Sequence, residues 1–135
     1  LDRSWGTLGG GTPGFDPRGP DARIDLLLAG LRLASLALVV PLMEELFWRS
    51  FLMRWLDAPA FAFADPRRTS LRAFILVAVL FGLEHDLWLA GVISGFVYNW
   101  LYVRTGRLWI PIASHAVTNG ALGAWILATH SWHLW

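Results

Sequence analysis

Two adjacent carboxylates, Glu44 and Glu45, stand inside a segment whose other side chains are nearly all apolar. The apolar run covers residues 24–43 before them and continues through residues 51–53 after them. Ionisable groups at membrane depth are costly and rare, and they usually face a protein interior or a cavity. The pair therefore predicts a functional site inside a membrane-embedded domain.

Three pairs of side chains at a spacing of four residues could complete such a site, because residues four apart share a helix face. A glutamate beside a histidine in a dry pocket can hold a water molecule for attack. A second histidine with an amide on the same face can donate hydrogen bonds to a developing oxyanion. The pairs are Glu45–Arg49, Phe81–His85 and His115–Asn119.

The spacing also assigns different roles to the two glutamates. Glu45 shares a face with Arg49 and is the charged support, whereas Glu44 has no such cation and is the candidate for chemistry. The alternative is structural, because a lone His or Asn in a membrane helix commonly bonds to a neighbouring helix. Asn99 and Tyr98 are interpreted in that structural way.

The depth of each ionisable group favours a shared site. Counting the helical rise from the nearest Arg places Glu44 about 15 Å, His115 about 12 Å and His85 about 20 Å into the membrane. The midplane of a typical hydrocarbon core lies about 15 Å from its edge. Three segments thus bring ionisable groups close to one level.

The composition indicates a membrane protein. Hydrophobic residues make up 56% of the 135 residues and charged residues only 16%, against about 25% in a typical soluble domain. The absence of cysteine excludes disulfides and thiolate zinc sites. A net charge of +1 gives no support for nucleic-acid binding, so the expected partner is the lipid bilayer.

We expect an all-α, polytopic transmembrane bundle with about four apolar helices. The first is one long helix over residues 24–56, about 50 Å in length and kinked at Pro41. The others cover residues 71–83, 87–103 and 108–129. Residues 1–23 form a Gly/Pro-rich flexible linker outside the membrane, and residues 24–135 the membrane-embedded core. Because the chain begins with Leu, we expect the C-terminal part of a larger bundle.

Arginines indicate the orientation of the bundle. If the second and third helices form an up-and-down pair, six arginines gather at one end, which the positive-inside rule assigns to the cytoplasm. They are Arg54, Arg67, Arg68, Arg72, Arg104 and Arg107. Gly91 and Gly95 form a GxxxG pattern that favours close helix packing, as do Gly120 and Gly123.

The motifs resemble those of the CPBP family of intramembrane proteases, which includes the CAAX prenyl proteases. The family's EExxxR, FxxxH and HxxxN motifs match in order here, at Glu44–Glu45–Arg49, Phe81–His85 and His115–Asn119. The surrounding residues are most similar to the CAAX-protease-related branch associated with exosortase systems.

The resemblance implies an endopeptidase of the bacterial inner membrane that needs no cofactor and cleaves a membrane-protein or peptide substrate. Glu44 would be the general base, with His85 helping to activate the water. Glu45 and Arg49 would hold that base in place. His115 and Asn119 would form the oxyanion site.

Two alternatives stay open beside this hypothesis. One Glu and two His with a water would satisfy a catalytic zinc site, although the HExxH pattern of many zinc proteases is absent. A non-catalytic membrane scaffold or immunity protein could keep the fold, yet every motif position here retains its residue. A soluble enzyme is the weakest hypothesis, because the apolar segments have almost no polar face.

Overall fold

The computed structural model describes residues 14–58 and 60–135, which are mainly α-helical. Within these residues the only β pairing is a single antiparallel bridge between Arg18 and Ile24. Residues 14–25 precede the first helix and are irregular apart from this bridge. The remainder of the predicted linker, residues 1–13, lies outside the described residues.

The predicted first helix is confirmed as one continuous helical rod over Leu26–Trp55. Asp25 caps its start by accepting a hydrogen bond from the Leu28 N–H at 3.0 Å. Within residues 14–58 and 60–135, it is the one helix that is long and apolar enough to cross a membrane by itself. The rod comprises α1 (Leu26–Ala34), η1 (Ser35–Val39), α2 (Val40–Glu45), η2 (Leu46–Leu52) and α3 (Met53–Trp55).

The sequence predicted a kink at Pro41; what the structure has there is the π-helical turn η1, which directly precedes α2. Pro41 has no N–H, and its ring crowds the carbonyl four residues earlier, so a wider turn relieves both problems. Here the Val40 N–H donates to the Ser35 carbonyl, five residues back. A second π-helical turn, η2, begins immediately after Glu45 and contains Arg49.

The remaining helices are confirmed, with ends within two residues of those expected. Ser70 caps α4 through its hydroxyl, which accepts from the Ala73 N–H, and Asp57 in turn accepts from Ser70. Gly106, with a φ of 66°, ends α5 in the left-handed conformation that glycine adopts without strain. The elements are η3 (Phe61–Phe63), η4 (Pro66–Arg68), α4 (Leu71–Leu83), α5 (Trp88–Thr105), α6 (Trp109–Thr129) and η5 (Trp132–Leu134).

Glycines let α4 and α5 pack as a tight antiparallel hairpin. A Cβ placed on Gly91 would lie 2.9 Å from the Gly82 Cα, and one on Gly95 would lie 2.9 Å from the Ala78 carbonyl oxygen. Both distances are shorter than real Cβ contacts. The predicted role of the GxxxG pattern in close packing is confirmed, and the hairpin loop that follows α4 carries His85.

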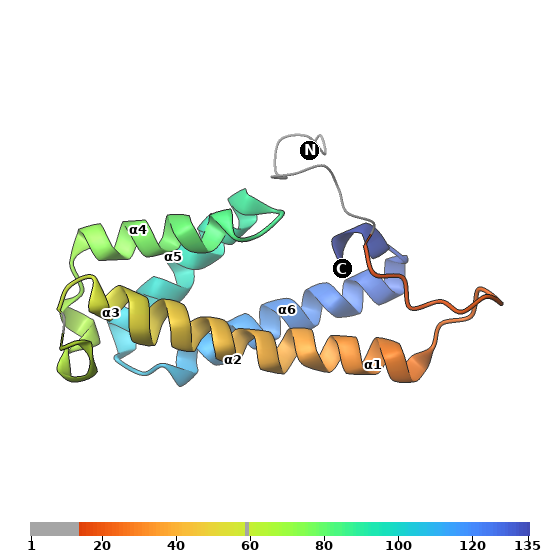
Figure 1. Cartoon of the computed structure of the whole chain (residues 1–135), viewed down its shortest axis with the longest axis horizontal. Helices are drawn as coiled ribbons and strands as arrows, with labels where there is room; N and C mark the ends of the chain where they lie inside the picture. Colours follow the sequence, from red (N-terminus) through yellow and green to blue (C-terminus); the bar gives the residue numbers. More distant parts are fainter. Residues whose placement is uncertain (1–13, 59) are drawn as a thin grey trace.

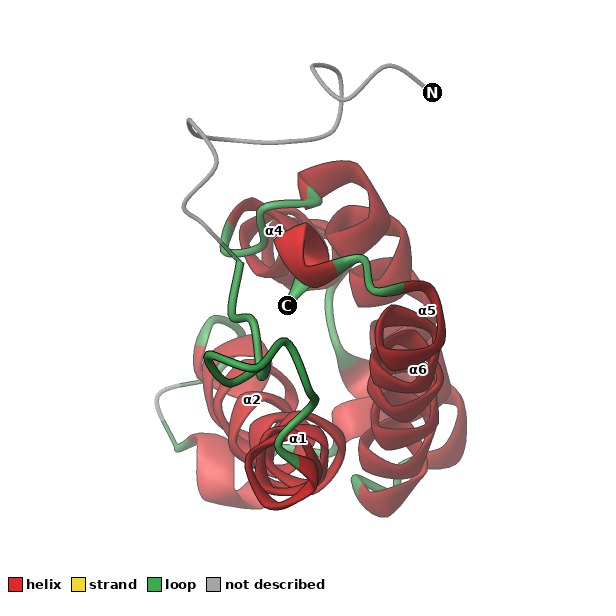
Figure 2. Cartoon of the chain, turned by 90° about the vertical axis from the view of Figure 1, so that its right-hand side faces the viewer, coloured by secondary structure: helices red, strands yellow, loops and turns green. Residues whose placement is uncertain are grey.

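Helix α6 runs antiparallel to the first helix along α1, η1 and α2 (Figure 1). Viewed along the long axis, the helices surround a common centre (Figure 2). The buried cluster where the hairpin meets the first helix includes Trp48, Met53, Val77, Phe81 and Tyr98.

Large apolar side chains remain exposed along the first helix and α6. Leu26 is 82% exposed, Met43 64% and Val117 71%. Exposed apolar surface that extends along whole helices is rare in soluble monomers and marks contact with lipid or with other protein. The fold is therefore the expected all-α membrane bundle.

Candidate active site

The structure brings together the ionisable groups that the sequence predicted at one depth. Glu44 of α2 places Oε2 3.9 Å from the Nε2 atom of His85 and 3.9 Å from that of His115. These separations are too long for direct hydrogen bonds. No described residue donates a hydrogen bond to Glu44 Oε2. The Glu44 and His85 side chains are 22% and 34% exposed, although the Glu44 Oε2 atom itself is buried.

Glu45 lies beneath this group in a fully buried layer. Its Oε1 atom accepts hydrogen bonds from Arg49 Nη1 and from His115 Nδ1, both at 3.0 Å. Glu45 and Arg49 are each 0% exposed. Removing either partner of such a buried pair would leave an uncompensated charge, so we expect each of the two side chains to need the other. The sequence-predicted pairing of Glu45 with Arg49 is present in this geometry.

Arg49 is also held from α5. Its Nε atom donates to Asn99 Oδ1 at 3.0 Å, and Asn99 Nδ2 donates to the Phe74 carbonyl at 2.8 Å. Asn99 thereby links the first helix to both arms of the hairpin, which agrees with the interhelical role predicted for it. Arg49 also lies over the Phe81 ring, with 4.2 Å from Cζ to the ring centroid.

Hydrogen bonds orient both imidazoles. A carbonyl can only accept, so His85 Nδ1 carries a hydrogen that it donates to the Phe81 carbonyl at 2.7 Å. His115 Nδ1 donates to Glu45 in the same way. Each ring therefore turns its Nε2 atom towards Glu44. In the neutral form these two Nε2 atoms are hydrogen-bond acceptors.

Aromatic rings pack around the histidines, and the sequence reasoning did not assign them to the site. Tyr98 stacks on His115, with ring centroids 4.9 Å apart, and Phe81 contacts the rings of both histidines. Trp48 Nε1 donates to Glu84 Oε2 at 3.1 Å, which ties the hairpin loop to the first helix. The available signal was position, since Tyr98 precedes Asn99 and Glu84 precedes His85.

Asn119 makes its described hydrogen bond away from Glu44. Its Nδ2 atom donates to the Leu36 carbonyl of η1 at 3.1 Å. Its side chain is therefore engaged with the first helix one turn along α6 from His115.

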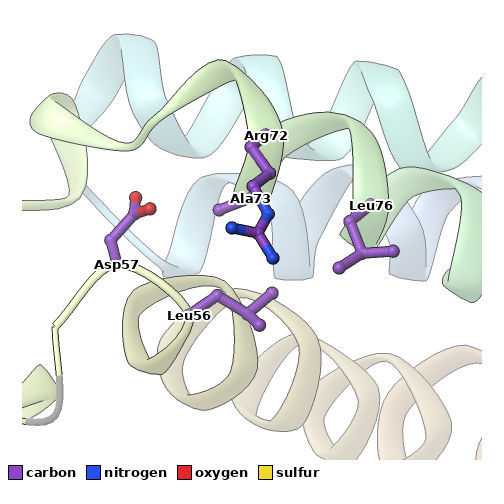
Figure 3. Close-up of a pocket in the computed structure, with 5 residues that line it drawn as sticks. All are labelled: Leu56, Asp57, Arg72, Ala73 and Leu76. Atoms are coloured by element: carbon purple, nitrogen blue, oxygen red, sulfur yellow. The ribbon is translucent and has the colours of Figure 1, made fainter.

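Neither of two cavities near the arginine-rich end includes a predicted site residue. One, of about 30 Å³, is lined by Leu56, Asp57, Arg72, Ala73 and Leu76 (Figure 3). The other, of about 230 Å³, lies between the end of the first helix and the η3–η4 loop. Among residues 14–58 and 60–135, no three His, Asp or Glu side chains are grouped as a metal site.

Comparison with known proteins identifies the family. Residues 26–121 match the sequence profile of the family described as Type II CAAX prenyl endopeptidase Rce1-like. The chain belongs to this family. The match covers the rod, the hairpin and the part of α6 that carries His115 and Asn119, and it supports the CPBP resemblance.

One curated relative also matches. It is the Bacillus subtilis (strain 168) protein named "Putative membrane peptidase YdiL", which is 30% identical over 111 residues. The alignment covers 78% of this chain, and the chain spans 42% of the relative's length. No solved structure matches the chain significantly.

Proposed function

We propose that this chain forms the catalytic core of an intramembrane endopeptidase in which Glu44 acts as the general base. The observation that carries the proposal is the position of Glu44 Oε2, which has no described hydrogen-bond donor and faces two histidine Nε2 atoms at 3.9 Å. Glu45 Oε2 also has no described donor, but the Glu45 side chain is fully buried and its Oε1 atom is held by Arg49 and His115, so substrate reaches Glu44 first. Family membership supports the assignment to peptide-bond hydrolysis.

The geometry favours a water molecule as the attacking group. Glu44 Oε2 and the two Nε2 atoms are all acceptors when the histidines are neutral, so a water between them can donate both its hydrogens. Glu44 would take one proton as the water oxygen bonds to the peptide carbonyl carbon. The same proton would pass to the leaving amine nitrogen as the C–N bond breaks, which regenerates the Glu44 carboxylate.

The other predicted residues would support this step. His85 would orient the water, because the Phe81 carbonyl fixes its ring. Glu45 and Arg49 would hold His115 from below. His115 and Asn119 remain the proposed oxyanion donors. Because Glu45 takes the Nδ1 hydrogen of His115, that ring would donate through Nε2 only in its doubly protonated form, with the water then held by Glu44 and His85. Asn119 has one amide hydrogen left for that purpose after its bond to Leu36.

The test compares the membrane proteins of cells that carry wild type or Glu44→Gln. We expect at least one membrane protein to lose a terminal fragment only with wild type. Asp86→Asn is the matched control, because it removes an exposed carboxylate beside His85 that makes none of the described site contacts. A non-catalytic scaffold would leave all three protein patterns identical, and cleavage by Glu44→Gln would refute the assignment of the base.

The zinc-dependent alternative would use Glu44, His85 and His115 as metal ligands. Cleavage by the purified enzyme in the presence of a chelator distinguishes it from the metal-free mechanism. We expect cleavage to survive a strong chelator. Loss of cleavage with chelator and its return with Zn²⁺ would favour the metal mechanism instead.

We also propose that the chain belongs to the exosortase-associated branch of the family and lies in a bacterial inner membrane. Both proposals rest on the residues that flank the three motifs. The processed protein found by the Glu44→Gln comparison tests the branch. A substrate with no relation to an exosortase sorting system would count against it.

A further inference from the structure

The Leu36 carbonyl in η1 lacks the main-chain donors that a helix normally provides. In an α-helix it would accept from the N–H of Val40, but that N–H donates to Ser35 instead. In a π-helix it would accept from residue 41, which is Pro41 and has no N–H. A carbonyl without a donor at this depth is costly, because lipid offers no replacement.

Asn119 of α6 supplies the missing donor. Its Nδ2–H bonds to the Leu36 oxygen at 3.1 Å, across 83 positions of sequence. The helices approach closely on either side of this bond. A Cβ on Gly120 would lie 3.7 Å from the Ala37 Cβ, and one on Gly123 would lie 2.5 Å from Leu33 Cδ1. Glycines thus lie next to Asn119, whose side-chain amide donates to the carbonyl that lacks a main-chain donor in the opposite helix.

We infer that Asn119 is a positioning residue that docks α6 onto the Pro41 break and so sets His115 against Glu44 and Glu45. Asn119 and His115 lie one turn apart on α6 and both contact the first helix, at Leu36 and at Glu45. The bond to Leu36 fixes how far α6 can slide or rotate along the rod. The 3.0 Å contact between His115 and Glu45 depends on that register.

This docking role does not require the proposed function, which enters only in its consequence for catalysis. It also differs from an oxyanion role, which would act on substrate through the remaining amide hydrogen. The two roles predict different responses to Pro41→Ala. That substitution restores an N–H at position 41, so the rod can satisfy Leu36 by itself through either residue 40 or residue 41.

The experiment is a double-mutant cycle of Asn119→Ala and Pro41→Ala, with disulfide formation as its readout. The native chain has no cysteine, so Ala37→Cys and Gly120→Cys can be introduced as a unique pair. Their Cβ separation of 3.7 Å matches disulfide geometry. The initial rate of cross-linking under a mild oxidant, in membranes, then measures how well α6 is docked on η1.

We expect Asn119→Ala to slow cross-linking about tenfold in the Pro41 background, because the hydrogen bond that holds α6 against η1 at Leu36 is lost. In the Pro41→Ala background the same substitution should slow it less than about threefold. Val117→Ala is the control on the same helix, since the Val117 side chain is 71% exposed. It should leave the rate unchanged in both backgrounds.

An equal loss in the two backgrounds would overturn the inference, as would no loss in either. If Asn119→Ala alone fails to fold, a folded Pro41→Ala/Asn119→Ala protein supports the inference and an unfolded one refutes it. Cleavage of the substrate is measured in parallel. Pure oxyanion chemistry predicts that cleavage falls equally in both backgrounds while cross-linking stays constant.

Because cross-linking needs no substrate, failure of the proposed peptidase function would leave this test intact.

Discussion

Glu44 and Glu45 are neighbours in the chain but have different surroundings. Glu45 is fully buried and its Oε1 atom accepts from Arg49 and His115, whereas the Glu44 side chain is 22% exposed and its Oε2 atom faces two imidazoles. Successive residues on a helix point about 100° apart, so one carboxylate can enter the protein interior as the next faces the site entrance. The spacing of four residues thus predicted the ion pair of Glu45 with Arg49, and the roles of the two glutamates stay a prediction.

Replacing Glu45 should destabilise the fold much more than replacing Glu44. Glu45→Leu leaves Arg49 buried without its counter-charge, which costs about 3–5 kcal/mol. Glu44→Gln removes no described hydrogen bond at Oε2 and should change the free energy of unfolding by less than about 1 kcal/mol. Thermal unfolding of the purified proteins in micelles, followed by tryptophan fluorescence, measures both.

The control for that comparison is the double variant Glu45→Leu/Arg49→Met, in which no charge remains buried. It should be more stable than Glu45→Leu alone, because the uncompensated guanidinium is gone. Equal stability of Glu45→Leu and Glu44→Gln would show that the buried layer contributes nothing to folding.

Two kinds of local irregularity shape the helices around the site. The π-helical turns η1 and η2 bracket the Glu44–Glu45 segment, and such turns are frequent at functional sites. The α4–α5 hairpin depends on glycine, because backbone approaches backbone where Gly82 and Gly91 meet. This close approach carries the loop with His85 to the level of Glu44.

Gly82→Ala should therefore weaken the hairpin. The added Cβ would lie 2.5 Å from the Val92 nitrogen and 2.8 Å from the Trp88 carbonyl oxygen, so α4 and α5 must separate. We expect a loss of about 1–3 kcal/mol in the free energy of unfolding, as for overpacked cores. Unfolding in micelles by circular dichroism provides the measurement.

Gly30→Ala is the matched control for this substitution. Gly30 is in the exposed middle of α1, and a Cβ there meets nothing within 4 Å. Alanine should stabilise the helix by about 0.5–1 kcal/mol. If Gly82→Ala behaved like Gly30→Ala, the hairpin would not rely on the absence of a side chain.

The bundle as a whole has a polar asymmetry. The η3–η4 loop and the end of α5 bring their arginines to one end, where Arg67 donates to the Thr105 carbonyl and Arg54 to the Ala62 and Ala64 carbonyls. At the opposite end, beyond α6, Trp132 and Trp135 stack on each other, and Trp132 is buried. The predicted grouping of arginines is thus present in the fold.

The orientation in the membrane follows from this asymmetry and can be measured with single cysteines. By the positive-inside rule, we expect Ala62→Cys to react with an impermeant maleimide only after cells are opened. His133→Cys, at the opposite end of α6 and also exposed, should react in intact cells. The reverse pattern would mean that the arginine end faces outwards, and the cysteine-free parent is the control for background labelling.

The sequence by itself determined the helices and indicated which ionisable groups lie at one level, because both depend on local rules. Apolar run length predicted the four helical segments, and spacing of four residues paired Glu45 with Arg49. Depth counted along each helix brought Glu44, His85 and His115 to one level, and the structure places them within 3.9 Å contacts.

Only the tertiary structure decided which groups hold that site in place. Asn99 bonds to Arg49 across 50 positions, and Asn119 bonds to Leu36 across 83. Such contacts depend on how helices rotate and slide against one another, which the spacing within a single helix does not specify. The π-helical turn before Pro41 is the clearest case. The sequence predicted a kink there, whereas the structure has a π-helical turn whose Leu36 carbonyl receives its donor from another helix.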